Sequence, residues 1–256
     1  MSDLSAFSLE GKTALVTGGS TGIGQAIAIE FAKVGATVAI TSHNHGADET
    51  CLAVQTFGKE CLVLGLDLAT ISSQDVAQIF DEIEAQLGQV DILVNSAGII
   101  RRGPAHEFSD DDWQAVMAVN LDAVWKLSRE AGKRMLKQGS GKIINIASLL
   151  SFQGGITVPA YTASKHAVAG LTKALANEWA ASNIQVNAIA PGYIATKVTQ
   201  ALRDDETRNR QILERIPAGH WGQPAEIAGA AVFLASDAAS YVQGHILSVD
   251  GGWMAR

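Results

Sequence analysis

The strongest constraint on the fold of this chain is a regular alternation of short apolar runs with longer helical patterns. The apolar residues of each short run are continuous instead of alternating with polar ones. Continuous hydrophobicity over four to eight residues indicates strands that are covered on both faces, as in parallel sheets. Seven such runs occupy residues 13–17, 37–41, 61–65, 91–95, 142–146, 185–189 and 245–249.

The segments between these runs have helical patterns, which predicts repeated β-α-β units with right-handed crossovers. We therefore expect an α/β fold of the Rossmann type: a doubly wound, seven-stranded parallel sheet with helices on both faces, in three αβα layers. No linker interrupts the alternation, so residues 1–256 are expected to form one domain. About residues 193–223 the chain is polar and lacks a strand signal, which predicts a mobile helical lid; a plain surface excursion is the alternative.

Composition excludes several classes of partner. The net charge of -7 argues against nucleic acid and anionic membranes, which require clustered positive charge. No apolar run is long enough to span a bilayer, and a cytoplasmic location is expected. Cys51 and Cys61 are interpreted as separate structural thiols. His43 and His45 lack a third ligand nearby, so no metal site is expected.

A glycine-rich turn follows the first apolar run, in the order Thr17-Gly-Gly-Ser-Thr-Gly-Ile-Gly24, and a helical pattern begins directly after it. Gly18 permits a tight turn, Gly22 lets the backbone approach a pyrophosphate, and Gly24 removes a side chain where the helix meets the strand. The free N–H groups of the helix would then face the phosphate charge. This arrangement predicts a dinucleotide site, with a plain glycine-rich turn as the alternative.

The residue that ends the second strand chooses between NAD and NADP in such folds. Ser42, His43 and Asn44 stand there, so the chain has neither the acidic residue typical of NAD binding nor the arginine typical of NADP binding. Asp67 ends the third strand and is a candidate for hydrogen bonding to the adenine, although a carboxylate at this place is also a common helix cap.

Four polar residues form a candidate catalytic set. Tyr161 and Lys165 lie four residues apart in a helical pattern, which places both on one face. Ser148 follows a buried strand, where ligand sites form in α/β sheets, and Asn120 lies in the preceding helical segment. The alternative is a polar cluster without chemistry.

The residue types suit proton transfer coupled to hydride transfer. Lys165 and an oxidised nicotinamide ring both favour the phenolate, which predicts that the pKa of Tyr161 falls below its ordinary value of about 10. Tyr161 would then exchange a proton with the substrate oxygen. Ser148 would hold that oxygen, and Asn120 would position a water that relays protons past Lys165. These residues predict an oxidoreductase acting on a carbonyl or alcohol carbon.

The chain resembles the short-chain dehydrogenase/reductase family over essentially its whole length. The matching pieces are Thr17–Gly24, Asp67, Asn95-Ser-Ala-Gly98, Asn120, Ser148, Tyr161-x-x-x-Lys165 and Pro191–Thr196; Ser96 replaces the usual second asparagine. The resemblance implies a homotetramer, with Asn95 and Ala97 beside the cofactor and Ile194 and Thr196 at the nicotinamide carboxamide. The expected cofactor contacts are Gly18, Ser20, Thr21, Gly22, Ile23, Gly24, Ser42, His43, Asp67, Leu68, Asn95, Ala97, Gly98, Tyr161, Lys165, Pro191, Gly192, Ile194 and Thr196.

Within the family, the chain resembles dehydrogenases of deoxy sugar acids from uronate breakdown. This narrower resemblance favours NAD(H) as the cofactor, with NADP(H) also possible. A sugar acid needs a guanidinium for its carboxylate, and Arg101, Arg102 or a neighbouring subunit's Arg256 would supply one; a surface salt bridge is the alternative role for each. The expected substrate contacts are Arg101, Arg102, Ser148, Gln153, Tyr161 and Gln200. The alternatives are a 3-oxoacyl carrier-protein reductase, disfavoured by the negative charge, and a cofactor-binding regulator without turnover.

Overall fold

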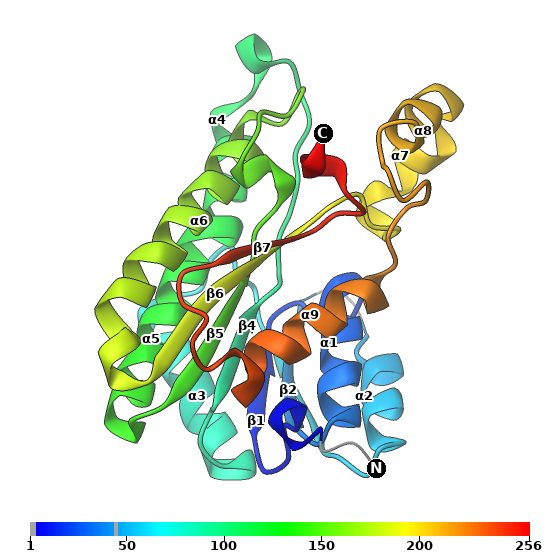
Figure 1. Ribbon diagram of the computed structural model, residues 1–256. Coiled ribbons are helices and arrows are strands. Elements are labelled where there is room, and N and C mark those ends of the chain that lie inside the picture. The colour runs from blue at the N-terminus through cyan, green and yellow to red at the C-terminus, as the bar shows by residue number, and fades with distance from the viewer. Residues whose placement is uncertain (1–3, 44–45) are drawn as a thin grey trace.

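The computed structural model describes residues 4–43 and 46–256 (Figure 1). Within them seven strands form one parallel sheet in the order β3-β2-β1-β4-β5-β6-β7, which confirms the predicted fold class. The order reverses direction at β1, and the sheet is therefore doubly wound. The strands are β1 (Thr13–Val16), β2 (Thr37–Ser42), β3 (Cys61–Gly65), β4 (Ile92–Asn95), β5 (Gly141–Ile146), β6 (Ile184–Pro191) and β7 (Ile246–Val249).

Helices cover both faces of the sheet, as Figure 1 shows. One face carries α1 (Gly22–Lys33), α2 (Asp48–Gln55) and α9 (Pro224–Ala235). The opposite face carries α3 (Ser73–Leu87), α5 (Ala123–Gln138) and α6 (Pro159–Trp179), with α4 (Asp110–Met117) packed against α6. A π-helical turn (Ala118–Asp122) joins α4 to α5.

Each strand divides its side chains between two hydrophobic cores. Ala14 and Val16 of β1 pack towards α1 and α9, whereas Leu15 packs towards α3 and α5. Successive side chains point to opposite sides of a strand, and all four residues of β1 are buried because helices cover both faces of the sheet. This is why the strands have continuous apolar sequences instead of alternating ones.

Local signals fix where several helices begin and end. Ser72 and Asp75 form a reciprocal capping box at the start of α3. Proline stands in the first turn of both α6 and α9, where its missing N–H costs no hydrogen bond. Gly139 ends α5 in the left-handed conformation. The starts of α3, α6 and α9 hold loops at the carboxyl edge of the sheet in defined positions, whereas the end of α5 leads into the start of β5 at the opposite edge.

The segment predicted to be helical between β6 and β7 leaves the sheet and forms α7 (Gln200–Asp204) and α8 (Glu206–Leu213). A bridge between Ile194 and Gly222 closes its base. Its apolar side packs against a short C-terminal turn (Trp253–Ala255) and the loop that follows β5. Figure 1 shows α7 and α8 standing apart from the two helical layers, beyond the carboxyl ends of the strands.

The interpretation of the two cysteines as separate thiols is wrong. Cys51 of α2 and Cys61 of β3 form a disulfide, with their Cα atoms 5.3 Å apart. The short turn between α2 and β3 folds the strand back beside the helix, which brings the two residues together.

In the part of the chain that the structure describes, no helix is long and apolar enough to cross a membrane.

Candidate active site

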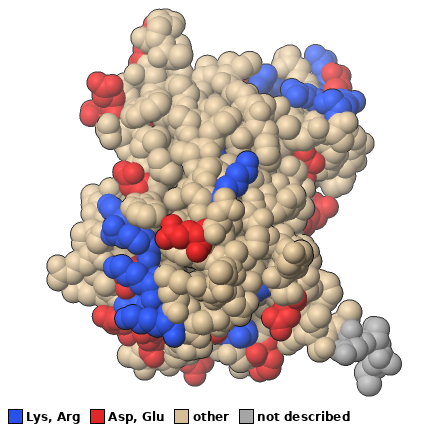
Figure 2. Space-filling view, turned by 60° about the vertical axis from the view of Figure 1, so that its left-hand side comes forward, with Lys and Arg blue, Asp and Glu red and all other residues tan. Residues whose placement is uncertain are grey.

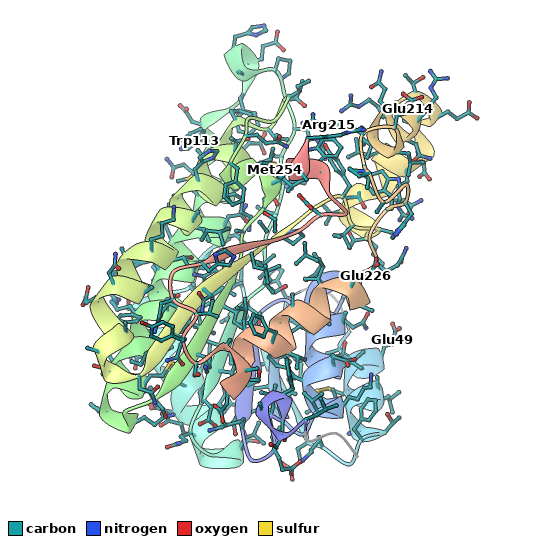
Figure 3. The ribbon with its side chains drawn as sticks, in the orientation of Figure 1. Glu49, Trp113, Glu214, Arg215, Glu226 and Met254 are labelled. Atoms are coloured by element: carbon teal, nitrogen blue, oxygen red, sulfur yellow. A yellow bond between two sulfur atoms is a disulfide. The ribbon has the colours of Figure 1, made fainter. Side chains whose placement is uncertain are left out.

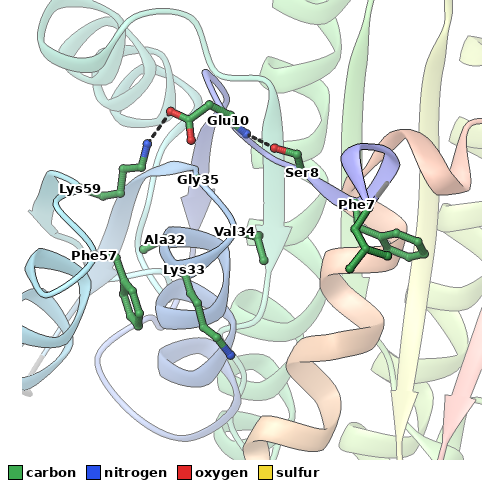
Figure 4. A pocket seen from close by; sticks show the side chains of 10 residues that line it. Phe7, Ser8, Glu10, Ala32, Lys33, Val34, Gly35, Phe57 and Lys59 are labelled. Carbon is green, nitrogen blue, oxygen red and sulfur yellow. Dashed lines mark hydrogen bonds and ion pairs between the residues drawn. The ribbon is translucent and has the colours of Figure 1, made fainter. Parts of the chain in front are cut away.

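The polar residues singled out by the sequence gather at the carboxyl ends of β1, β4, β5 and β6. In doubly wound sheets ligands bind at this edge, next to the point where the strand order reverses. A different hollow lies at the opposite edge, between the N-terminal segment and the end of α1 (Figure 4). It contains Phe7 and Phe57 and an ion pair of 2.8 Å between Glu10 and Lys59, and none of the predicted site residues.

The glycine-rich turn forms a cradle in which side chains would not fit. Gly18 and Gly22 both have positive φ angles, of 64° and 60°. A Cβ atom at Gly18 would lie 3.0 Å from the Cα of Ala97, and one at Gly24 would lie 2.4 Å from the carbonyl oxygen of Gly18. Thr196 closes the cradle from the other side, since its Cγ2 lies 3.5 Å from where a Cβ atom at residue 22 would stand in place of the glycine hydrogen. Ser20, Thr21 and Ile23 lie in the same turn.

This cradle fits the diphosphate of a dinucleotide. Thr21 precedes α1 with an extended backbone and makes no side-chain cap, so the first N–H groups of a 12-residue helix have no side-chain acceptor from it. Thr17 holds the far wall, because its hydroxyl oxygen accepts hydrogen bonds from the N–H groups of Ser96 and Ala97 at 3.0 and 3.1 Å. The structure thus brings Gly18, Gly22, Ala97 and Thr196 together as predicted.

The ends of β2 and β3 lie side by side, as expected for the adenosine half of the site. Ser42 is paired in register with Gly65, and its carbonyl accepts a hydrogen bond from the N–H of Leu66. The ring of His43 lies 4.0 Å from the carboxylate of Asp67. Asp67 also accepts a hydrogen bond of 2.9 Å from the N–H of Ala69, so it caps its own turn. The buried Leu68 follows it.

Asn44 and His45 lie outside the described residues, and the interpretation of His43 and His45 as a solvated loop therefore stays a prediction. Among the residues that the structure does describe, no group of three potential ligands could hold a metal ion.

Tyr161 and Lys165 lie on one face of α6, below the loop that contains Ser148. The Nζ atom of Lys165 lies 5.6 Å from the centre of the Tyr161 ring and donates a hydrogen bond of 2.6 Å to the carbonyl oxygen of Ile146, the last residue of β5. The hydroxyl of Ser151 donates to the carbonyl of Lys165 at 2.7 Å. These bonds fix α6 against the end of β5 and bring the three predicted catalytic side chains together.

Burial has the largest effect on the pKa values of Tyr161 and Lys165. Desolvation raises the pKa of the Tyr161 phenol, while a hydrogen bond with Ser148 and the nearby Arg102 guanidinium lower it. Desolvation also lowers the pKa of Lys165 to about 8. The sequence predicted a lowered Tyr161 pKa caused by Lys165 and the nicotinamide; in the protein alone, burial outweighs the groups that favour phenolate.

Asn120 is buried in the π-helical turn between α4 and α5, and its amide is engaged with backbone. It accepts a hydrogen bond from the N–H of Ile99 at 2.8 Å and donates to the carbonyl of the same residue at 2.9 Å. The adjacent Gly98 lies next to Lys165, since a Cβ there would be 3.8 Å from its Nζ. The Asn120 side chain therefore holds the loop after β4 beside Lys165.

The side chain of Asn95, a residue predicted to lie beside the cofactor, is engaged inside the protein. Its side-chain amide donates to Ser128 at 3.0 Å and to Asn145 at 2.8 Å, and Asn145 donates to Thr172 of α6. The Asn95 side chain therefore lies in a buried network that ties β4 and β5 to α5 and α6. Pro191, Gly192 and Ile194 follow from β6 into the lid segment, where a Cβ at Gly192 would lie 2.6 Å from the Cα of Asp250.

The predicted substrate residues divide into two groups. Arg101 forms an ion pair of 3.3 Å with Asp112, and Gln200 donates to Asp204 at 2.7 Å, so both are engaged locally. Arg102 is close enough to Tyr161 to lower its pKa. Gln153 lies in the loop after Ser148 and accepts a hydrogen bond from Arg215.

Arg215 is a residue of this region to which the sequence assigned no role. It follows α8, and its guanidinium carbon lies 4.0 Å from the centre of the Trp253 ring. Figure 3 shows its side chain beside the C-terminal turn that carries Met254. The sequence shows an arginine in a segment without a strand pattern and a tryptophan near the C-terminus. Only the fold shows that these two residues are in contact.

Comparisons with known proteins agree with this arrangement. A family described as Enoyl-(Acyl carrier protein) reductase matches residues 18–254. A 2-dehydro-3-deoxy-D-gluconate 5-dehydrogenase from Bacillus subtilis is 58% identical over 253 residues, which is 98% of each chain. The enzyme of that name from Escherichia coli is 52% identical over 254 residues, or 99% of each chain.

Solved structures match over nearly the whole chain as well. A putative 2-deoxy-d-gluconate 3-dehydrogenase from Agrobacterium tumefaciens with bound NADP has 56% identity and a TM-score of 0.91, covering 98% of this chain and 99% of that one. A gluconate 5-dehydrogenase from Burkholderia cenocepacia, in complex with NADP and tartrate, has 40% identity and a TM-score of 0.93 over 100% of both chains.

Proposed function

Since this chain belongs to the short-chain dehydrogenase/reductase family and is an oxidoreductase, we propose that it interconverts the keto and hydroxy forms of a deoxy sugar acid such as 2-dehydro-3-deoxy-D-gluconate, at C5. The observation that supports this most is the meeting of Ser148, Tyr161 and Lys165 at the carboxyl edge of the sheet, beside the glycine cradle. A bound NAD(P)(H) supplies or accepts the hydride.

Tyr161 is proposed to exchange the proton. In the reducing direction the phenol gives its proton to the substrate oxygen while the carbonyl carbon gains the hydride, and the product is an alcohol. Burial raises the pKa of Tyr161, so the phenol is protonated at neutral pH before any ligand binds. The protein without ligand therefore already carries the proton that reduction of a substrate ketone needs. Oxidation of the alcohol needs the phenolate form of Tyr161 instead.

Ser148 and Lys165 are proposed to position the reacting groups. A hydrogen bond with Ser148 lowers the pKa of Tyr161, and the Ser148 hydroxyl would hold the substrate oxygen next to the phenol. Lys165 is fixed by the carbonyl of Ile146, so its ammonium stays below the Tyr161 ring. Asn120 is proposed to act by holding the loop at Gly98 and Ile99 beside Lys165, and not through a water bound to its own amide.

We propose that the chain accepts both NADP(H) and NAD(H). The described residues at the end of β2, Ser42 and His43, include no carboxylate that would repel a 2′-phosphate. The solved structures of several relatives contain NADP. The preference for NAD(H) suggested by the narrower resemblance therefore has no support from the residues around Ser42.

The substrate class is supported by the relatives, which are named for sugar acids, and by the tartrate in one of them. The test is a kinetic comparison of NAD+ and NADP+ with 3-deoxy-hexulosonates, which carry a hydroxyl at C5, and of NADH and NADPH with the corresponding 3-deoxy-hexo-2,5-diulosonates and with 3-oxoacyl thioesters. Turnover of the sugar acids supports the proposal. Turnover of acyl thioesters alone would replace it with the carrier-protein reductase alternative, and dinucleotide binding without turnover of any ketone would indicate a regulator.

We also propose a homotetramer in which α4 and α5 are covered by other subunits. Trp113 and Trp125 on these helices are 36% and 39% exposed. The view that brings this side of the molecule forward shows stretches of uncharged surface between clusters of Lys and Arg and of Asp and Glu (Figure 2). Large exposed apolar areas are typical of subunit interfaces.

The lid role of residues 193–223 and the cytoplasmic location stay predictions.

A further inference from the structure

A guanidinium without an acidic partner lies beside the loop that begins at Ser148. Arg215 is exposed, and none of the ion pairs formed within residues 4–43 and 46–256 includes it. Its one side-chain hydrogen bond there, to Gln153, is long at 3.5 Å. By contrast, Arg101 is neutralised by Asp112. Arg215 therefore retains both its charge and its donors for an anion.

The position of this guanidinium is fixed from two sides. Its central carbon lies 4.0 Å from the centre of the Trp253 ring, and Trp253 is only 4% exposed and thus cannot move aside. Arg256 donates a hydrogen bond of 2.5 Å to the carbonyl of Glu214, which ties the C-terminus to the residue before Arg215. Side chains held in advance lose less conformational entropy on binding, so a stacked arginine is a better anion site than a free one.

The same cluster connects Arg215 to the reacting groups. Leu149, the neighbour of Ser148, packs with Ile216 and Trp253 in one buried cluster, and Gln153 lies four residues further along the same loop. The indole Nε1 of Trp253 is buried without a hydrogen-bond partner in the described structure. The loop after β5 thus carries Ser148 at one end and the Arg215 contact at the other.

We propose that Arg215 binds the carboxylate of the substrate, with Gln153 as a neighbouring polar contact. This inference rests on the proposed function, in which the reacting carbon is C5. The C1 carboxylate of such an acid lies four carbons away from the reacting centre, so its partner must stand apart from Tyr161. Arg102 acts on the Tyr161 phenol itself and therefore belongs to the reacting end. Arg215 stands at the other end of the Ser148 loop.

The test compares Arg215→Met and Arg215→Lys with the wild type in the reducing direction, using a 3-deoxy-hexo-2,5-diulosonate and the same ketone with its carboxylate converted to a primary amide. We expect Arg215→Met to lower kcat/KM for the acid by about 10- to 100-fold, mainly through KM, because a charge-assisted hydrogen bond is lost. Turnover of the amide, dinucleotide affinity and thermal stability should stay unchanged. Arg215→Lys should recover part of the loss, because it restores the charge without the planar fork.

Arg210→Met is the matched control, since Arg210 lies on α8 and already faces Glu214 at 3.9 Å. It should behave like the wild type. Equal losses on acid and amide, or an unchanged kcat/KM for the acid in Arg215→Met, would overturn the carboxylate assignment alone. A wild-type enzyme that reduces other ketones but no sugar acid would overturn the proposed function, and this inference with it.

Discussion

The side-chain nitrogen of Lys165 lies 2.6 Å from the carbonyl oxygen of Ile146, so a cation is held inside the protein by a backbone group and not by a carboxylate. Burial without an acidic partner is what lowers the pKa of Lys165 to about 8. The residue is thus expected to act as a fixed charge below the Tyr161 ring in neutral solution, and as a neutral amine in alkaline solution.

This burial predicts a pH-dependent stability. Between about pH 8 and the ordinary Lys pKa of 10.5, the unfolded chain keeps a proton that the folded chain has released. The stability of the wild type should therefore rise with pH through this window, relative to a variant without the amine. We expect the free energy of unfolding of Lys165→Met to exceed that of the wild type at neutral pH, and the excess to shrink by about 2 kcal/mol towards pH 10. Urea denaturation of both cofactor-free proteins measures it; a difference independent of pH would contradict the assignment.

Arg102 provides a prediction for the pH profile of catalysis. Its guanidinium lowers the pKa of Tyr161, so replacing it with glutamine should raise that pKa. Oxidation needs the phenolate, and the rising limb of its pH profile should move to higher pH, less at high salt because Arg102 is exposed. Arg101→Gln is the control, since Arg101 pairs with Asp112. Equal shifts in both variants would show a general charge effect.

The glycine cradle can be tested by adding one methyl group. Gly24→Ala places a Cβ 2.4 Å from the carbonyl oxygen of Gly18, and the turn must open to receive it. Such overpacking costs about 1–3 kcal/mol, so dinucleotide affinity should fall by about tenfold or more. Gly229→Ala in α9 is the matched control, because no atom lies within 4 Å of its Cβ position. It should bind normally and gain up to about 1 kcal/mol of stability. If Gly24→Ala bound NADPH as tightly as the wild type, the assignment of the glycine turn as the dinucleotide site would be wrong.

The disulfide between Cys51 and Cys61 predicts sensitivity to reductants. It closes a loop of 10 residues, and opening it should lower the free energy of unfolding by about 3 kcal/mol. Urea denaturation with and without a dithiol reductant measures this loss, which the double variant Cys51→Ser/Cys61→Ser should not show. Two titratable thiols in native protein purified without reductant would contradict the bond.

The sheet and the glycine turn could be predicted because their signals are local. Continuous apolar runs reveal strands buried on both faces, and the spacing of Gly18, Gly22 and Gly24 directly after a strand is typical of a dinucleotide-binding turn. The residues of each strand agree with the predicted runs to within two positions at either end. Tyr161 and Lys165 were found for the same reason, since one helical turn separates them.

Partners far apart in the sequence were not predictable. Asn95 bonds Ser128 and Asn145, which lie 33 and 50 positions away. The packing of α5 against β4 brings Ser128 to it, and the register of β4 with β5 brings Asn145. The same holds for the stacking of Arg215 on Trp253, which depends on how the C-terminus folds back over α8. The raised pKa of Tyr161 could not be foreseen either, because it depends on how much water the surrounding loops exclude.

The central claim is that the Tyr161 hydroxyl moves the proton, and single-turnover reduction by Tyr161→Phe tests it most directly. With saturating NADPH and the 5-keto form of the sugar acid, the hydride-transfer rate of this variant should fall by about a factor of 10³, in line with the loss of a positioned general acid. Its dinucleotide affinity should equal that of the wild type. Hydride transfer at the wild-type rate by Tyr161→Phe would contradict the claim.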